Sequence, residues 1–235
     1  MGKNMNTDIN NIELKNIKTP WTNKKKKIAA ISSALIGILI FSASYFVATS
    51  TNSINKSVLD FMLSLRQEDL TNYIKIITIM GSLSTAGILT IAIAAIWASY
   101  KREFWRPVLL VLAMLATGAV TVLFKSWYMI NRPAAKFMIR PLETDYAFPS
   151  GHTIAVFVLV LVIGYLICSR RSSPLRVFNW LTTTLILTAI MAFMRLYLGY
   201  HWLTDTTASV GLGLIILSFV IIVDKFITKK FVKLQ

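Results

Sequence analysis

The chain has 235 residues, of which 55% are hydrophobic and 15% are charged, and its formal net charge is +15. With a mean hydropathy of +0.63, this composition excludes an ordinary soluble domain and indicates a protein embedded in a membrane. The single cysteine, Cys168, rules out an internal disulfide framework and gives no functional signal.

The first 27 residues are polar and rich in Asn, Lys and Thr, so they carry too little apolar surface to fold alone. We expect a disordered, basic cytoplasmic leader over 1–27. The run Lys24 to Lys27 directly precedes the first apolar stretch. It is interpreted as an anchor on the cytoplasmic side of the first span, with binding of anionic lipid as the alternative.

Six apolar stretches follow that are long enough, or nearly so, to cross the hydrocarbon core, which takes about 20 residues. They are 28–48, 74–99, 107–124, 153–168, 176–195 and 206–223. The sequence therefore predicts an all-α, polytopic membrane protein. Its single domain is a six-transmembrane-helix bundle over 28–224, followed by a basic cytoplasmic tail at 225–235.

The segment between the first two spans is amphipathic. Apolar residues recur there at helical spacing (Ile54, Val58, Phe61, Met62, Leu65), opposite the polar residues Asn55, Ser57, Ser64 and Arg66. This pattern predicts a helix lying in the outer interface. We interpret it as a structural cap on the bundle, with a role in gating lipid entry as the alternative.

Lys and Arg gather in alternate connections, namely the leader, the turns 100–106 and 169–176, and the tail. By the positive-inside rule, both termini are predicted to be cytoplasmic. Because topology accounts for most of the basic excess, we expect no nucleic-acid partner.

Three clusters of reactive residues lie in the remaining, outer connections. The first is Lys125, followed by Arg132 and Pro133. Seven residues are about two helical turns, so on a continuing helix both cations would face one way, and Pro133 would end the helix soon after Arg132. Two fixed cations suit one phosphate, although cations at span ends also commonly reach the lipid headgroups.

The second cluster is Pro149-Ser150-Gly151-His152, directly before the fourth span. Pro and Gly shape a turn that opens a helix, and the unpaired N–H groups of a helix start can bind an anion. His152 could give a proton to a leaving oxygen. The alternative is a plain helix start with a histidine near the headgroups.

The third cluster is Arg195, His201 and Asp205. A spacing of four places the imidazole and the carboxylate on one helical face. A carboxylate that accepts from one imidazole nitrogen fixes the tautomer and leaves the other nitrogen free to attack. An interfacial ion pair is the alternative, but the chain holds only two histidines and each lies in one of these clusters.

The three clusters resemble the type 2 phosphatidic acid phosphatase family, whose signature reads KxxxxxxRP, PSGH and SRxxxxxHxxxD. This chain reads KSWYMINRP, PSGH and MRLYLGYHWLTD. The one departure is Met194, where the family usually has Ser, and it bears on fine positioning rather than on the type of reaction. The resemblance implies catalytic roles for His201, His152 and Asp205. It implies phosphate binding by Lys125, Arg132, Ser150, Gly151 and Arg195.

The resemblance also implies hydrolysis of a lipid phosphate or diphosphate at the outer membrane face, through a phosphohistidine and without a metal or other cofactor. Candidate substrates are undecaprenyl diphosphate, phosphatidylglycerol phosphate and phosphatidic acid, reached laterally from the membrane lipids. In the loop 134–148, Lys136 and Arg140 could bind a second phosphate, but Glu143 and Asp145 argue against it. We expect that loop to be a solvated connector.

Two rival functions stay open on the sequence. A transporter or flippase of anionic lipids would also use outer cations, but it normally needs polar groups and broken helices near the bilayer midplane, and the spans show neither clearly. An inactive binder of lipid phosphate is disfavoured because every charged and imidazole position of the signature is present.

Overall fold

The computed structural model describes residues 21–50, 53–101, 104–170 and 173–232. Within these ranges every regular element is a helix, and six helices are long and apolar enough to cross a membrane. The long helices are α2 (Asn23–Ser50), α5 (Leu83–Lys101), α6 (Trp105–Tyr128), α7 (Gly151–Cys168), α8 (Pro174–Tyr197) and α9 (Leu203–Val232). The shorter ones are α3 (Ser53–Ser64), α4 (Glu68–Thr78), η1 (Ile79–Gly81) and η2 (Ala135–Phe137). The predicted six-helix membrane fold is confirmed.

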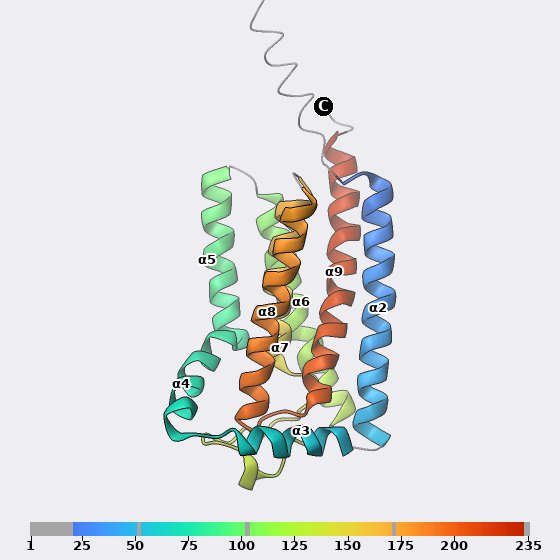
Figure 1. Cartoon of the computed structure of the whole chain (residues 1–235). Helices are drawn as coiled ribbons and strands as arrows, with labels where there is room; N and C mark the ends of the chain where they lie inside the picture. The colour runs from blue at the N-terminus through green and yellow to red at the C-terminus, as the bar shows by residue number, and fades with distance from the viewer. Residues whose placement is uncertain (1–20, 51–52, 102–103, 171–172, 233–235) are drawn as a thin grey trace, which may run out of the picture.

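The predicted second span, 74–99, is wrong in extent. Its first residues belong to α4 and η1, and the membrane helix α5 begins only at Leu83. Ser82 causes the break, because its backbone is extended and its hydroxyl accepts a hydrogen bond from the Thr85 N–H at 3.1 Å, as a helix N-cap does. In Figure 1, α4 accordingly turns away from the axis of α5 at the lower end of the bundle.

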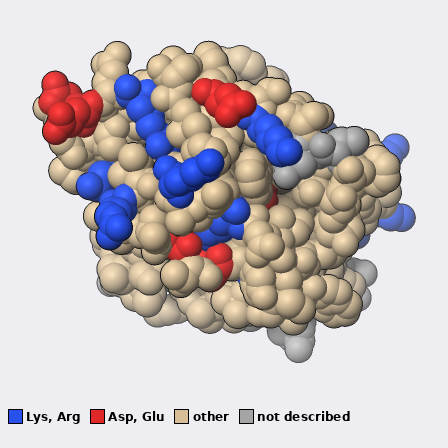
Figure 2. Space-filling view, turned by 90° about the horizontal axis from the view of Figure 1, so that it is seen from below, with Lys and Arg blue, Asp and Glu red and all other residues tan. Residues whose placement is uncertain are grey.

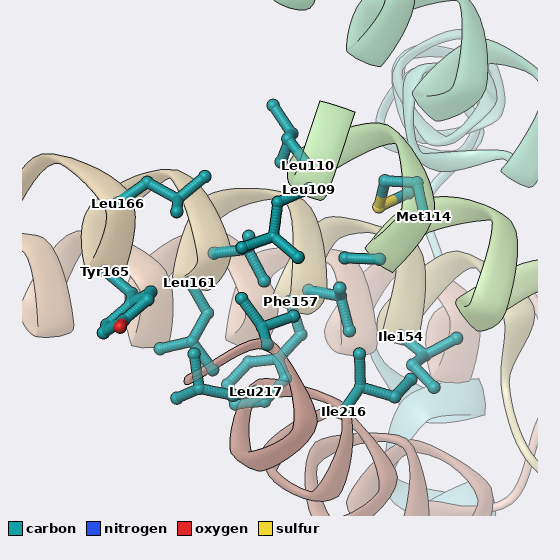
Figure 3. Packing of buried hydrophobic residues seen from close by; sticks show 14 of the residues in the cluster. Leu109, Leu110, Met114, Ile154, Phe157, Leu161, Tyr165, Leu166, Ile216 and Leu217 are labelled. Carbon is teal, nitrogen blue, oxygen red and sulfur yellow. The ribbon is translucent and has the colours of Figure 1, made fainter. Parts of the chain in front are cut away.

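The central helix is α7, which contacts α5, α6, α8 and α9. In its most apolar window 67% of the residues are buried, against 17% in α2. Figure 3 shows Phe157 and Leu161 of α7 packed with Leu109 of α6 and Leu217 of α9. Because lipid chains are as apolar as these side chains, the helices are held by close van der Waals fit rather than by removal of apolar surface from water.

The span α2 packs along α9 through two facing glycines. A Cβ on Gly37 would lie 2.6 Å from the Gly211 carbonyl oxygen, and one on Gly211 would lie 2.6 Å from the Phe41 nitrogen. Only glycine at both positions allows the two backbones to approach so closely.

A buried ion pair joins the same two helices at the end where α2 begins and α9 ends. Lys26 Nζ lies 2.7 Å from Asp224 Oδ2, and the Tyr165 hydroxyl donates to the same oxygen at 2.7 Å. Lys26, interpreted from the sequence as part of a positive-inside anchor, is enclosed in the bundle. Residues 23–27 were expected to be disordered, but they belong to α2, which begins at Asn23. Residues 1–20 of the expected leader and 233–235 of the tail lie outside the described residues, and the cytoplasmic placement of both termini stays a prediction.

The helix predicted over 54–66 is present as α3, which lies across the opposite end of the bundle (Figure 1). The faces expected for it are partly wrong. Its buried residues are Asn55, Leu59 and Met62, whereas Ile54 and Phe61 are exposed. Contacts with α8 and α9 decide which face is covered, so a polar residue from the expected outer face points into the protein.

We expect Gly37→Ala to lower the thermal midpoint of the detergent-solubilised protein, because the added methyl would force the α2 and α9 backbones apart. Overpacking of this kind costs about 1–3 kcal/mol. Gly118→Ala is the matched control, since a Cβ on Gly118 meets nothing within 4 Å, and it should leave the midpoint unchanged or slightly raised. Equal midpoints for the two variants would contradict a close contact between α2 and α9.

Candidate active site

The three sequence clusters meet at the end of the bundle that α3 crosses. They come from the last turn of α6 with the loop after it, from the first turn of α7, and from the end of α8 with the turn into α9. Figure 2 views this end and shows blue basic side chains gathered beside red acidic ones over its middle. Residues up to 80 positions apart in the sequence therefore form one site.

Lys125 and Arg132 converge, but not on one helix as expected. Helix α6 ends at Tyr128, because Met129 adopts a left-handed conformation (φ 47°) and its N–H bonds to the Lys125 carbonyl. Arg132 follows in irregular backbone, which the proline after it favours. Both side chains nevertheless reach the Asp145 carboxylate, Lys125 Nζ at 2.5 Å and Arg132 Nη2 at 2.5 Å.

The PSGH segment forms the predicted turn and helix start. Ser150 is the N-cap of α7, with extended backbone, and Gly151 and His152 begin the first turn. The turn is fastened to α9, because the Ser150 N–H donates to the Asp205 carbonyl at 3.2 Å and the Ser209 hydroxyl donates to the Ser150 carbonyl at 3.0 Å. Ser150 is fully buried, whereas His152 is partly exposed at the start of the helix.

His201 and Asp205 are paired, although His201 precedes the helix on which both were expected. Helix α9 begins at Leu203, and Gly199 (φ 74°) turns the chain out of α8 so that His201 approaches Asp205. His201 Nδ1 lies 3.2 Å from Asp205 Oδ2, and the Trp202 N–H donates to the same oxygen at 2.8 Å. A Cβ on Gly199 would meet the Phe137 carbonyl oxygen at 2.3 Å, so this turn needs glycine.

The partners of His201 decide its tautomer. Arg132 Nη1 lies 3.2 Å from His201 Nε2, and a guanidinium has only donors, so Nε2 must be the acceptor. The proton then sits on Nδ1, facing Asp205. Burial lowers the pKa of His201 well below its ordinary value, and the charges of Arg132, Arg195 and Lys125 lower it further. His201 is therefore a neutral imidazole with an unprotonated nitrogen directed toward the cations.

Arg195, in the last turn of α8, is the most enclosed of the cations. It is 1% exposed, and its guanidinium carbon lies 4.5 Å from the centre of the Tyr200 ring. Its Nη2 pairs with Glu143 Oε1, and its Nε is buried with no hydrogen-bond partner among the described residues. A buried donor without a partner indicates a place for an acceptor atom.

The loop 134–148 is not the solvated connector that the sequence predicted. Glu143 bridges Arg132 (2.7 Å) and Arg195, while Asp145 bridges Lys125 and Arg132. Burial alone would raise the pKa of Asp145, but hydrogen bonds and charge from Lys125 and Arg132 outweigh it and leave the pKa below its ordinary value. The two carboxylates therefore lie directly against the three cations.

The remaining sequence candidates lie outside this network. Lys136 stacks over the Phe137 ring at 4.9 Å, and Arg140 is exposed. Met194, the departure from the family signature, is buried among apolar residues. The sequence did not predict the roles of Tyr200 and Trp202. The Tyr200 carbonyl accepts from Arg132 and its ring lies against Arg195, while the Trp202 N–H donates to Asp205. Only their position between Arg195 and Asp205 in the sequence could have indicated these roles.

The arrangement suits an oxyanion. Three cations lie near a neutral imidazole, with Arg132 linked to Lys125 through Asp145 and to Arg195 through Glu143. The N-terminal turn of α7 belongs to the same cluster, since the charges of Arg195, Lys125 and Arg132 all act on His152. Within the described ranges no group of three or more His, Cys, Asp or Glu could hold a metal ion. The geometry offers a nucleophilic nitrogen, an orienting carboxylate and a second imidazole.

The chain is similar in sequence to known proteins. The PAP2 superfamily matches residues 106–229. The chain is 24% identical over 186 residues to phosphatidylglycerophosphatase B of Bacillus subtilis (strain 168), a match that covers 77% of this chain and 90% of that protein.

Two solved structures share the fold. One is the crystal structure of a transmembrane PAP2 type phosphatidylglycerolphosphate phosphatase from Bacillus subtilis, with a TM-score of 0.70, 22% identity, and coverage of 84% of this chain and 96% of that one. The other is Aquifex aeolicus LpxE, with a TM-score of 0.56, 18% identity, and coverage of 74% and 98%.

We expect His201 to remain neutral at pH 6.5 and well below it, because burial and the neighbouring cations disfavour the imidazolium. The chain has two histidines, so a His152→Gln variant leaves His201 as the only one. Its ring resonances, followed by NMR from pH 8 to pH 5, should not titrate near the ordinary value of about 6.5 that the denatured chain should show. A His201 signal that titrates at or above pH 6.5 would contradict this assignment.

Proposed function

The chain belongs to the PAP2 superfamily and is a membrane lipid phosphatase, and we propose that it hydrolyses its lipid phosphate at the outer membrane face through a phosphohistidine on His201. Membership confirms the resemblance that the three motifs carry. The catalytic and phosphate-binding roles of individual residues, the substrate and the side of the membrane are the substance of the proposal.

The contact set of His201 carries the proposal. Asp205 accepts from Nδ1, while Nε2 faces Arg132, one of three converging cations. A phosphate held by those cations would place phosphorus beside an unprotonated nitrogen of a neutral imidazole. A solvated interfacial ion pair would not need a buried, neutral histidine between a carboxylate and a guanidinium.

The charge for phosphate binding would come from Lys125, Arg132 and Arg195. Glu143 and Asp145 supply carboxylate oxygens to these same cations. The phosphate oxygens of the substrate would take the place of those carboxylates and would also reach the unpartnered Arg195 Nε. The start of α7, with Ser150 and the Gly151 N–H, would complete the ring of donors.

In the first step, the His201 Nε2 lone pair would form the bond to phosphorus as the bond from phosphorus to the ester oxygen breaks. His152 would give its proton to that oxygen, and Asp205 would stabilise the positive imidazole. The three cations would bear the charge on the equatorial oxygens. In the second step, water would give its proton to His152 and attack phosphorus, releasing inorganic phosphate and restoring His201.

The positive-inside rule supports the outer face, since the basic turns lie at the end of the bundle opposite the candidate site. The substrate headgroup would then react where it already lies, with its apolar chains in the lipid. Undecaprenyl diphosphate, phosphatidylglycerol phosphate and phosphatidic acid meet this requirement. The Bacillus subtilis relative, by its name, favours phosphatidylglycerol phosphate as the first substrate to test.

Purified protein in detergent should release inorganic phosphate from at least one of these three lipids, and His201→Ala should abolish the release. We expect the rate to persist in EDTA, because Lys125, Arg132 and Arg195 supply the positive charge. Loss of a nucleophile typically lowers kcat by about 10⁴-fold or more. Turnover that survives in a folded His201→Ala protein would refute the nucleophile assignment, and lipid binding without any release would favour a binding or transport function.

Asp145→Asn should strengthen inhibition by inorganic phosphate about two- to fivefold, because an exposed ion pair that competes for Lys125 and Arg132 contributes up to about 1 kcal/mol. The measurement is the inhibition constant of phosphate against lipid hydrolysis. Asp69→Asn, which removes an exposed carboxylate of α4, is the control for a change of net charge. An equal effect of both variants would show that Asp145 does not compete for the phosphate position.

A further inference from the structure

Asn55 of α3 reaches the turn that carries the catalytic pair. Its side-chain oxygen accepts a hydrogen bond from the Thr204 N–H at 3.1 Å, and its amide donates to the Thr204 hydroxyl at 3.0 Å. Asn55 is 1% exposed and Thr204 is 3% exposed. Two residues separated by 149 positions thus make a paired contact one residue before Asp205.

This contact supplies a helix cap that the local sequence lacks. The first N–H groups of a helix have no partner within the helix, and a capping residue normally binds those of the second or third position. Trp202 stands at the N-cap of α9, and an indole has no acceptor. Asn55 binds the N–H of the second helical residue, Thr204, as an N-cap side chain would.

Asp205 completes the other half of the same arrangement. It is the third residue of α9, and its Oδ2 accepts from the Trp202 N–H at 2.8 Å. In a capping box, the side chain of the third helical residue accepts from the N-cap N–H, and the N-cap side chain accepts from the N–H of the third residue. Asp205 makes the first of these bonds from within α9. Asn55, from α3, caps the N–H of the second residue instead, while the Asp205 N–H donates to the Trp202 carbonyl.

We propose that Asn55 is a positioning residue for the reaction, which holds the first turn of α9 so that Asp205 keeps its orientation toward His201. The inference rests on the proposed function, because it concerns the same site. Asp205 Oδ2 serves both Trp202 and His201, and Asp205 Oδ1 has no hydrogen-bond partner among the described residues. The orientation of the carboxylate therefore depends on the backbone of this single turn.

The role differs from both interpretations of the amphipathic helix that the sequence offered, a structural cap and a lipid gate. Ile54 and Phe61 of α3 are exposed on its other face, where the membrane interface would lie, while Asn55 faces inward. The position of α3 in the membrane interface would thus affect the geometry of the His201–Asp205 pair. Displacements of about 1 Å in an active site can change a rate about a hundredfold.

Asn55→Leu keeps a side chain of similar size but removes both hydrogen bonds. We expect kcat for lipid phosphate hydrolysis to fall about ten- to a hundredfold, while KM changes less than about threefold. Leu59→Ala is the matched control, because Leu59 is buried on the same face of α3, one helical turn away. It should lower the thermal midpoint while kcat stays within about twofold of wild type.

Asn55→Asp provides the rescue, because either protonation state of the carboxyl keeps an oxygen for the Thr204 N–H, and Asp caps helices about as well as Asn. We expect its kcat to lie within about threefold of wild type. If Asn55→Leu does not fold, Asn55→Ser replaces it, because its shorter side chain does not reach Thr204, and the same fall in kcat is expected.

A folded Asn55→Leu or Asn55→Ser protein with the kcat of wild type would overturn the inference. A loss of kcat in Leu59→Ala equal to that in Asn55→Leu would also overturn it. Absence of His201-dependent release in wild type would instead overturn the proposed function.

Discussion

Three neighbouring cations, joined through two carboxylates, form the constraint on which the rest of this site depends. Lys125, Arg132 and Arg195 repel one another, and Arg195 is almost completely enclosed, so the cluster requires an anion within it. Glu143 and Asp145 meet that requirement. The same requirement supports the proposed binding of a ligand with several anionic oxygens. Burial of His201, together with the charge of these cations, keeps the neighbouring imidazole neutral.

The first turn of α9 connects the parts of the site. Its Asp205 faces His201 through the side chain and Ser150 through the carbonyl, while Thr204 is held by Asn55. Two other helices, α3 and α7, are therefore fastened to this one turn of α9. A buried turn with so many polar groups is stable only when nearly all of them are hydrogen-bonded. The geometry of the His201–Asp205 pair therefore depends on these hydrogen bonds.

The helices that carry the candidate site are held together without a strong hydrophobic effect between them. Helices in lipid associate through close fit, and here α2 meets α9 at Gly37 and Gly211, while α7 is enclosed by its neighbours. The ion pair of Lys26 with Asp224 fastens the far end. The bundle is thus fixed at one end by a buried pair that the proposed reaction does not use, and at the other by the polar network of the candidate site.

The sequence by itself determined the six-helix membrane fold and which residues make up the three motif clusters. Spans are encoded in contiguous apolar runs, and motifs in short spacings between residues. Only the tertiary structure decided the break before Leu83, the end of α6 ahead of Arg132, and the place of His201 before α9. It also decided that Glu143 and Asp145 enter the site and that Asn55 faces inward. These features depend on which segments meet in space, since a loop carboxylate or a polar helix residue acquires its role from partners far away in the sequence.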